Sequence, residues 1–211
     1  ATVTFPAPLT VQSGQNVVRA DSPSFAAQTS AVTVIAPDVL MDPTRTSVGA
    51  SVYFKVSDFD PNETLTVTWR RPGGSSIAVA TVQTDATGSA GGTFTVPATE
   101  GGDANRVSFE TTNVRRALPF EVAPRIKITP ASVSPGQQVD VSLRGFGKQE
   151  TVEIRWRVGG VWQTIATVTT SNTGSANVLV TVPANADPGQ NSVRADGTKF
   201  RQQTNAVTVV P

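Results

Sequence analysis

The 211-residue chain has 17 basic and 16 acidic side chains, and this near balance argues against nucleic-acid binding and against a polybasic membrane contact. It has no histidine and no cysteine, which excludes a Ser-His-Asp triad, a His-ligated zinc site, a thiolate nucleophile and disulfides. No apolar run approaches the roughly 20 residues of a membrane span. Catalysis could use only Asp/Glu pairs, and no such pair stands out, so we do not expect an enzyme.

The first predicted elements near the N-terminus recur at the C-terminus. The stretch "GQNVVRAD" (residues 14–21) matches "GQNSVRAD" (189–196) at seven of eight positions. The stretch "FAAQTSAVTV" (25–34) matches "FRQQTNAVTV" (200–209) at seven of ten, and both matches keep an offset of 175 residues. Self-similarity at a fixed spacing is typical of tandem repeats.

A third copy lies midway, because landmark residues recur about 87 positions later. The pairs are Gly49 and Gly136, Phe59 and Phe146, Glu63 and Glu150, and Trp69 and Trp156. The motif "TGSA" also occurs twice, at residues 87–90 and 173–176. We therefore expect two complete repeats, residues 37–123 and 124–211, preceded by the C-terminal half of another, residues 1–36.

Each complete repeat alternates apolar and polar residues with a period of two. This holds for "SVYFKV" (51–56), "LTVTW" (65–69), "QVDVSL" (138–143) and "VEIRWR" (152–157). Such alternation predicts half-buried antiparallel strands, and turn signals such as "RPGG" and "SNTGS" separate them. About seven strands in each repeat predict an all-β fold of tandem immunoglobulin-like β-sandwiches.

The two aligned tryptophans, Trp69 and Trp156, fall on the apolar side of these strands. We expect them to be buried core residues, the alternative being platforms that stack on carbohydrate. The junctions "VIAPDVLMDP" (34–43) and "EVAPRIKITP" (121–130) are short and rich in proline, which fixes φ and stiffens a linker. Stiff junctions predict sandwiches arranged as a rod.

The run "PASVSPGQQVDVSLRGFGKQETVEIRW" (130–156), followed by "TGSA", "VTVPANADPG" and "AVTV", resembles bacterial immunoglobulin-like surface repeats of the IPT/E-set type. The resemblance covers essentially the whole chain as tandem copies. It implies an extracellular or cell-surface location. Repeats of this type serve as stalks, spacers, adhesin modules and enzyme accessories, so the resemblance does not select one function.

The segment "SDFDPNET" (57–64) concentrates oxygen ligands of the kind that calcium prefers. The candidate metal ligands are Asp58, Asp60, Asn62 and Glu63. The segment also resembles the acidic loop of bacterial cadherin-like repeats. The aligned segment "RGFGKQET" (144–151) keeps only Glu150, so a plain acidic turn is the alternative. Calcium is the only cofactor that the sequence suggests.

Three further motifs have structural alternatives. Trp162, in "GGVWQT" (159–164), has no counterpart in the middle copy and could contact a ligand or pack on its own loop. The motif "VRAD" (18–21 and 193–196) loosely resembles an adhesion tripeptide, and in its structural alternative Arg and Asp share one face of a strand and pair. Some surface immunoglobulin-like domains form a covalent Lys–Asn cross-link in the core. The alternation places Lys55 on the outer face of its strand, so we do not expect it to form such a bond.

The sequence favours a non-catalytic extracellular structural protein that forms a cell-surface stalk, fibre or surface-layer element. The alternative is an adhesin or a carbohydrate- or protein-binding module that acts through loops 159–163 or 57–64. The expected partners are further repeats of the same chain or other subunits, with a glycan as a second option.

Residues 1–36 supply about three strands, which would leave an apolar face and strand edges uncovered. Two hypotheses follow from this. Either the chain continues upstream, which we favour, or a neighbouring molecule adds the missing strands in trans and builds a homopolymer.

Overall fold

The computed structural model describes residues 14–16, 18–21, 23–24, 26–28 and 32–211. Every regular element in these ranges is a β-strand, as the alternation of apolar and polar residues predicts. The described part of the chain has no helix that is long and apolar enough to cross a membrane. The predicted all-β class is confirmed.

The first sandwich packs a three-stranded sheet against a five-stranded sheet. Its strands are β5 (Asp38–Asp42), β6 (Arg45–Thr46), β7 (Ser51–Ser57), β8 (Thr64–Arg70), β9 (Ser76–Gln83), β10 (Ala90–Thr95), β11 (Gly102–Glu110) and β12 (Arg115–Val122). The smaller sheet has the order β10-β7-β5 and the larger one β6-β12-β11-β8-β9. This two-sheet arrangement is immunoglobulin-like.

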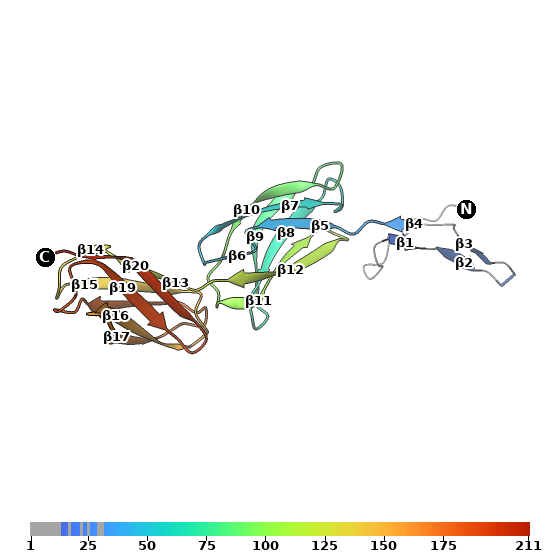
Figure 1. Cartoon of the computed structure of the whole chain (residues 1–211). Coiled ribbons are helices and arrows are strands. Elements are labelled where there is room, and N and C mark those ends of the chain that lie inside the picture. The colour runs from blue at the N-terminus through green and yellow to red at the C-terminus, as the bar shows by residue number, and fades with distance from the viewer. Residues whose placement is uncertain (1–13, 17, 22, 25, 29–31) are drawn as a thin grey trace.

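The second sandwich repeats the first strand by strand. Its strands are β13 (Arg125–Thr129), β14 (Ser132–Val133), β15 (Gln138–Arg144), β16 (Thr151–Val158), β17 (Val161–Thr169), β18 (Ala176–Thr181), β19 (Gly189–Asp196) and β20 (Arg201–Val209). The sheet orders are β13-β15-β18 and β14-β20-β19-β16-β17. Figure 1 shows the two sandwiches end to end.

Each sandwich has its own core, with a tryptophan at its centre. The side chains of Trp69 and Trp156 are both 0% exposed. The ring of Trp69 meets Phe120 edge-on, with 5.0 Å between ring centroids. Burying an apolar side chain of this size stabilises the fold by about 1.5–3 kcal/mol. The prediction of two core tryptophans is confirmed, and the alternative of carbohydrate platforms is wrong.

One strand pairing in each sandwich is parallel. The short strand β6 lies beside the last strand β12, with Arg45 opposite Glu121. In the same way β14 lies beside β20, with Ser132 opposite Thr208. The second strand of each sandwich therefore runs in the same direction as its last strand, whereas the first strand, β5 or β13, lies in the smaller sheet.

The described N-terminal strands form the same hairpin as β19 and β20. They are β1 (Gly14–Asn16), β2 (Arg19–Asp21), β3 (Ala26–Gln28) and β4 (Val32–Val34). The residue pairs Gly14–Val34 and Gly189–Val209 occupy equivalent places in the two hairpins, and both pairings are antiparallel. The offset of 175 residues therefore relates the strand-pairing register of the two hairpins as well as their amino-acid sequences.

Candidate functional site at the joint between the sandwiches

The link between the two sandwiches is two residues long. Strand β12 ends at Val122 and β13 begins at Arg125, so only Ala123 and Pro124 connect them. Gly145 packs directly on this link, with a φ of +68°, and a Cβ on it would lie 3.0 Å from the carbonyl oxygen of Ala123. A short link with proline and a neighbour in contact has little freedom to bend.

Backbone groups of the two sandwiches touch beside this link. The Gly101 amide donates a hydrogen bond to the carbonyl oxygen of Phe146, at 3.1 Å. A Cβ on Gly101 would lie 2.0 Å from the Gly145 carbonyl oxygen, and one on Gly174 would lie 3.1 Å from the Cα of Glu100. Glycine is the residue that allows backbones to approach this closely.

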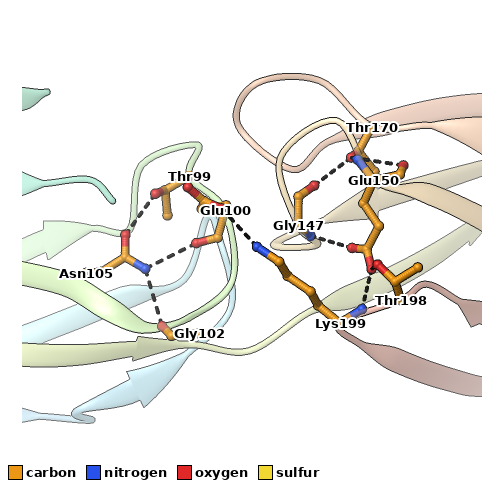
Figure 2. A network of polar contacts seen from close by, with 9 residues as sticks. All are labelled: Thr99, Glu100, Gly102, Asn105, Gly147, Glu150, Thr170, Thr198 and Lys199. Atoms are coloured by element: carbon orange, nitrogen blue, oxygen red, sulfur yellow. Dashed lines mark hydrogen bonds and ion pairs between the residues drawn. The ribbon is translucent and has the colours of Figure 1, made fainter. Parts of the chain in front are cut away.

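The loop that carries Gly101 is fixed from inside the first core. Trp69 donates its indole N–H to Asn105 Oδ1 at 3.2 Å. Asn105 in turn donates from Nδ2 to the carbonyl oxygens of Glu100 and Gly102, at 3.1 and 3.3 Å. Thr99 adds a bond to the same Oδ1, and Figure 2 shows the side chains around Asn105. These bonds all lie within the first sandwich, so the position of the Gly101 loop does not depend on contact with the second sandwich.

On the other side of the joint a buried carboxylate ties two loops together. Glu150 Oε2 accepts the Gly147 amide at 2.6 Å, and its Oε1 accepts the Thr198 hydroxyl and the Lys199 amide at 3.0 and 2.5 Å. Thr170 completes the cluster with a bond to the Gly147 carbonyl, as Figure 2 shows. Hydrogen bonds to a charged acceptor are strong, so Glu150 fixes the loop before β16 against the β19–β20 turn.

One ion pair crosses the joint. Lys199 Nζ lies 4.0 Å from Glu100 Oε2, and the lysine side chain is 63% exposed. Figure 2 shows these two side chains reaching toward each other between the sandwiches. A pair that is this long and this exposed contributes little to stability, so the glycine contacts and the backbone bond define the geometry.

The predicted calcium ligands hold a turn of the first sandwich. Asp60 Oδ2 accepts the Thr111 hydroxyl at 2.7 Å and the Asn113 amide at 2.9 Å. Glu63 Oε2 accepts the Thr112 hydroxyl at 2.8 Å. These bonds tie the acidic loop to the β11–β12 turn, just as Glu150 ties its own loop to the β19–β20 turn.

The other two predicted ligands, Asp58 and Asn62, lie within the turn of the acidic loop and, among the residues that the structure describes, make no hydrogen bond to the β11–β12 turn. Asp58 and Asn62 have positive φ angles of 62° and 55°, and Asp58 Oδ2 accepts the Ser57 hydroxyl. Among the residues that the structure describes, no group of three or more Asp, Glu, His or Cys side chains is placed to hold a metal ion. Calcium binding at residues 57–64 stays a prediction.

Trp162 stacks on a charged side chain of its own sheet. The guanidinium carbon of Arg194 lies 4.3 Å from the centroid of the indole ring. Arg194 also donates from Nε to Asp196 Oδ2 at 2.9 Å, which confirms the predicted pairing within "VRAD". Lys55 is exposed, as predicted. A ligand-binding role of Trp162 stays a prediction.

The repeated "TGSA" motif has a role that the sequence analysis did not identify. Gly88 and Gly174 pack against the carbonyl oxygens of Phe59 and Phe146, each leaving only 2.0 Å for an added Cβ. The recurrence of these glycines and phenylalanines at matching positions was the available signal. The contact between Gly174 and Glu100 across the joint could not be found in this way, because a contact between two different sandwiches does not recur within each repeat.

Comparison with known proteins gives no family for this chain. No family model matches, and no curated protein matches. Among solved structures, a tetra-tandem repeat from the extending region of a large adhesion protein shares 15% identity with a TM-score of 0.41, covering 90% of this chain and 55% of that one. The chain therefore spans about half the length of that structure.

Two other solved structures are similar at a lower level. Trypsin-activated alpha-2-macroglobulin from Escherichia coli shares 15% identity, with a TM-score of 0.32, and the match covers 77% of this chain and 14% of that one. Red sea bream transglutaminase shares 8% identity, with a TM-score of 0.30, over 84% of this chain and 32% of that one. The class of tandem immunoglobulin-like β-sandwiches rests on the strand order described above.

Proposed function

We propose that the chain is a non-catalytic structural segment of a cell-surface protein, in which immunoglobulin-like repeats of the IPT/E-set type form a stiff spacer. The observation that carries the proposal is the backbone hydrogen bond from Gly101 to Phe146, made where glycine allows the two sandwiches to touch. A spacer needs repeats that keep their relative orientation, and this joint supplies the contacts for that. Further repeats or other subunits are the partners that such a segment would have.

The joint opposes bending in two ways. Rotation about the link would break the Gly101–Phe146 bond, and a hydrogen bond of this kind contributes about 0.5–1.5 kcal/mol. Rotation the other way would press the Gly101 backbone into Gly145, where there is no room for even a methyl group. A bond on one side and a steric stop on the other hold one orientation.

The substitution Gly101→Ala tests this function. An added Cβ would lie 2.0 Å from the Gly145 oxygen, so the sandwiches must separate and lose the backbone bond. In ¹⁵N relaxation, we expect the unmodified sandwiches to tumble as one elongated body. The variant should show faster and separate tumbling of the two sandwiches.

The matched control is Gly136→Ala. Gly136 lies in the β14–β15 turn at the end of the second sandwich away from the joint, and an added Cβ there meets nothing within 4 Å. Its positive φ makes the substitution locally unfavourable, so it controls for a loss of stability without a change at the joint. Separate tumbling of the two unmodified sandwiches would contradict the spacer function.

A further inference from the structure

A cavity of about 260 Å³ opens beside the joint, between the two sandwiches. The first sandwich contributes Arg71 and Ser75 from the β8–β9 turn and Glu100 from the β10–β11 loop. The second contributes Lys148, Asn172 and Thr173. Small-molecule sites occur preferentially at domain interfaces, and this volume is just below their usual range of roughly 300–1,000 Å³. The space suits a ligand the size of one sugar unit.

The walls of this cavity are held in place without a ligand. On one side, the Arg71 amide donates to the Ser75 carbonyl at 2.8 Å, and Arg71 Nε donates to the Ala98 carbonyl at 2.9 Å. On the other side, the Ser171 amide donates to the Ser175 carbonyl at 2.8 Å, which closes the turn that carries Asn172 and Thr173. A preformed cavity reduces the ordering cost of binding.

Positive charge comes from both walls. The Arg71 side chain donates only from Nε, to the Ala98 carbonyl, and the Lys148 side chain is exposed. Within the described part of the chain, the Nη groups of Arg71 and the ammonium group of Lys148 have no protein partner. The one acid in the cavity, Glu100, lies 4.0 Å from Lys199 Nζ. Two free cationic groups facing one cavity favour an anionic ligand, and a guanidinium matches a carboxylate well.

Glu100 decides which kind of anion fits. Its carboxylate repels a bare dianion such as sulfate or phosphate, but it accepts a hydrogen bond from a hydroxyl group. Ser75, Asn172 and Thr173 add neutral polar groups that can bond to further hydroxyls. The ligand that satisfies both requirements has one carboxylate and several hydroxyls on a small ring.

We propose that this cavity binds one acidic sugar unit of the hexuronic acid class. Its carboxylate pairs with Arg71 and Lys148, and a ring hydroxyl donates to Glu100. Because the two cations belong to different sandwiches, a bound sugar bridges the joint. This binding activity goes beyond the spacer function, and it rests on the same fixed joint, because the cavity lies between the two sandwiches.

The experiment uses the full chain and follows backbone amides by NMR during titration with sodium glucuronate. We expect shifts to concentrate at Gly73, Lys148 and Asn172, and to be absent with glucose or sodium sulfate over the same concentration range. Lys148→Ala should weaken glucuronate binding by about tenfold, because it removes one charge-assisted contact from an exposed side chain. The matched control Lys127→Ala removes an exposed lysine on β13 of the same sandwich and should change nothing.

A second variant tests the role of Glu100. Glu100→Gln removes the repulsion of dianions, so sulfate should now shift the same amides. Three results would overturn the proposal: no shifts at the cavity, equal binding of sulfate and glucuronate to the unmodified chain, or unchanged affinity in Lys148→Ala.

Discussion

Glu150 explains at the residue scale why one acidic position recurs while its neighbours change. Glu63 and Glu150 align at an offset of 87, and in the structure both carboxylates bind the turn between the last two strands of their sandwich. The alignment was visible in the sequence. The role of the recurring glutamate was not visible, because its partners Thr198 and Lys199 lie 48 and 49 residues away from Glu150, in a turn that no spacing or motif connects to it.

Glu150→Gln should destabilise the second sandwich by about 1–3 kcal/mol. The amide nitrogen of glutamine cannot accept a bond, so it leaves either the Gly147 amide or the pair from Thr198 and Lys199 without a partner. Urea unfolding monitored by circular dichroism measures the loss. Glu63→Gln is the matched control, and it should cost much less because its carboxylate makes one bond at a more exposed place. Equal losses in the two variants would contradict the argument.

At the scale of elements, the strands were predictable and the loops between them were not. Alternation along residues 65–69 and 152–157 identified β8 and β16, because a strand with one buried face leaves that pattern. Residues 57–64 allow two interpretations, because acidic side chains suit a cation site and a hydrogen-bonded turn equally well. The residues that these acidic side chains bind in the structure, such as Thr111, lie in a different loop.

The turn before β10 gives a second example. Asp85 Oδ1 accepts bonds from the Thr87 amide and hydroxyl and from the Ser89 amide, at 2.8, 2.6 and 3.0 Å. The bond from the Thr87 side chain, followed by the two backbone bonds, lowers the pKa of this carboxyl below its usual value. In the second sandwich the hydroxyl of Ser171 receives the corresponding amide bonds. The two turns therefore have one shape with different chemistry.

Asn105 and Asn191 provide a matched test of how a loop is held. Both accept the indole N–H of a core tryptophan and donate to two carbonyls, one in the loop before the asparagine's own strand and one at the first residue of that strand. Replacing either by alanine leaves these groups unpaired and should cost roughly 2 kcal/mol or more in chemical unfolding. Only Asn105→Ala should also loosen the joint in ¹⁵N relaxation, because only its loop carries Gly101. Equal loosening by Asn191→Ala would contradict this assignment.

At the scale of the whole molecule, the repeat and its fold could be predicted, whereas the joint could not. The recurrence of Trp69 as Trp156, 87 positions later, indicates that the same folding unit occurs twice in the chain. Proline in the link indicated stiffness. The contact of Gly101 with Gly145 and Phe146 involves backbone atoms, and backbone contacts between distant glycines leave no side-chain pattern to detect.

The two cores share no buried residue, so the sandwiches should unfold as separate cooperative units. Calorimetry of the full chain is expected to resolve a transition that Glu150→Gln lowers and another that it leaves in place. Their separation would show that the joint sets orientation and contributes little to the stability of either sandwich. A single transition that moves as a whole in the variant would contradict this view.

The parallel pairing of the short second strand with the last strand of each sandwich has a mechanical consequence. Arg45 and Glu121 form an ion pair at 2.8 Å across β6 and β12, and in the second sandwich the Thr208 and Val210 amides donate to the carbonyls of Ala131 and Val133. A pull on the two ends of a sandwich drags these neighbouring strands in opposite directions along their length. Their bonds are then loaded in shear and share the force at the same moment, whereas a hairpin pulled at its open end parts one bond at a time.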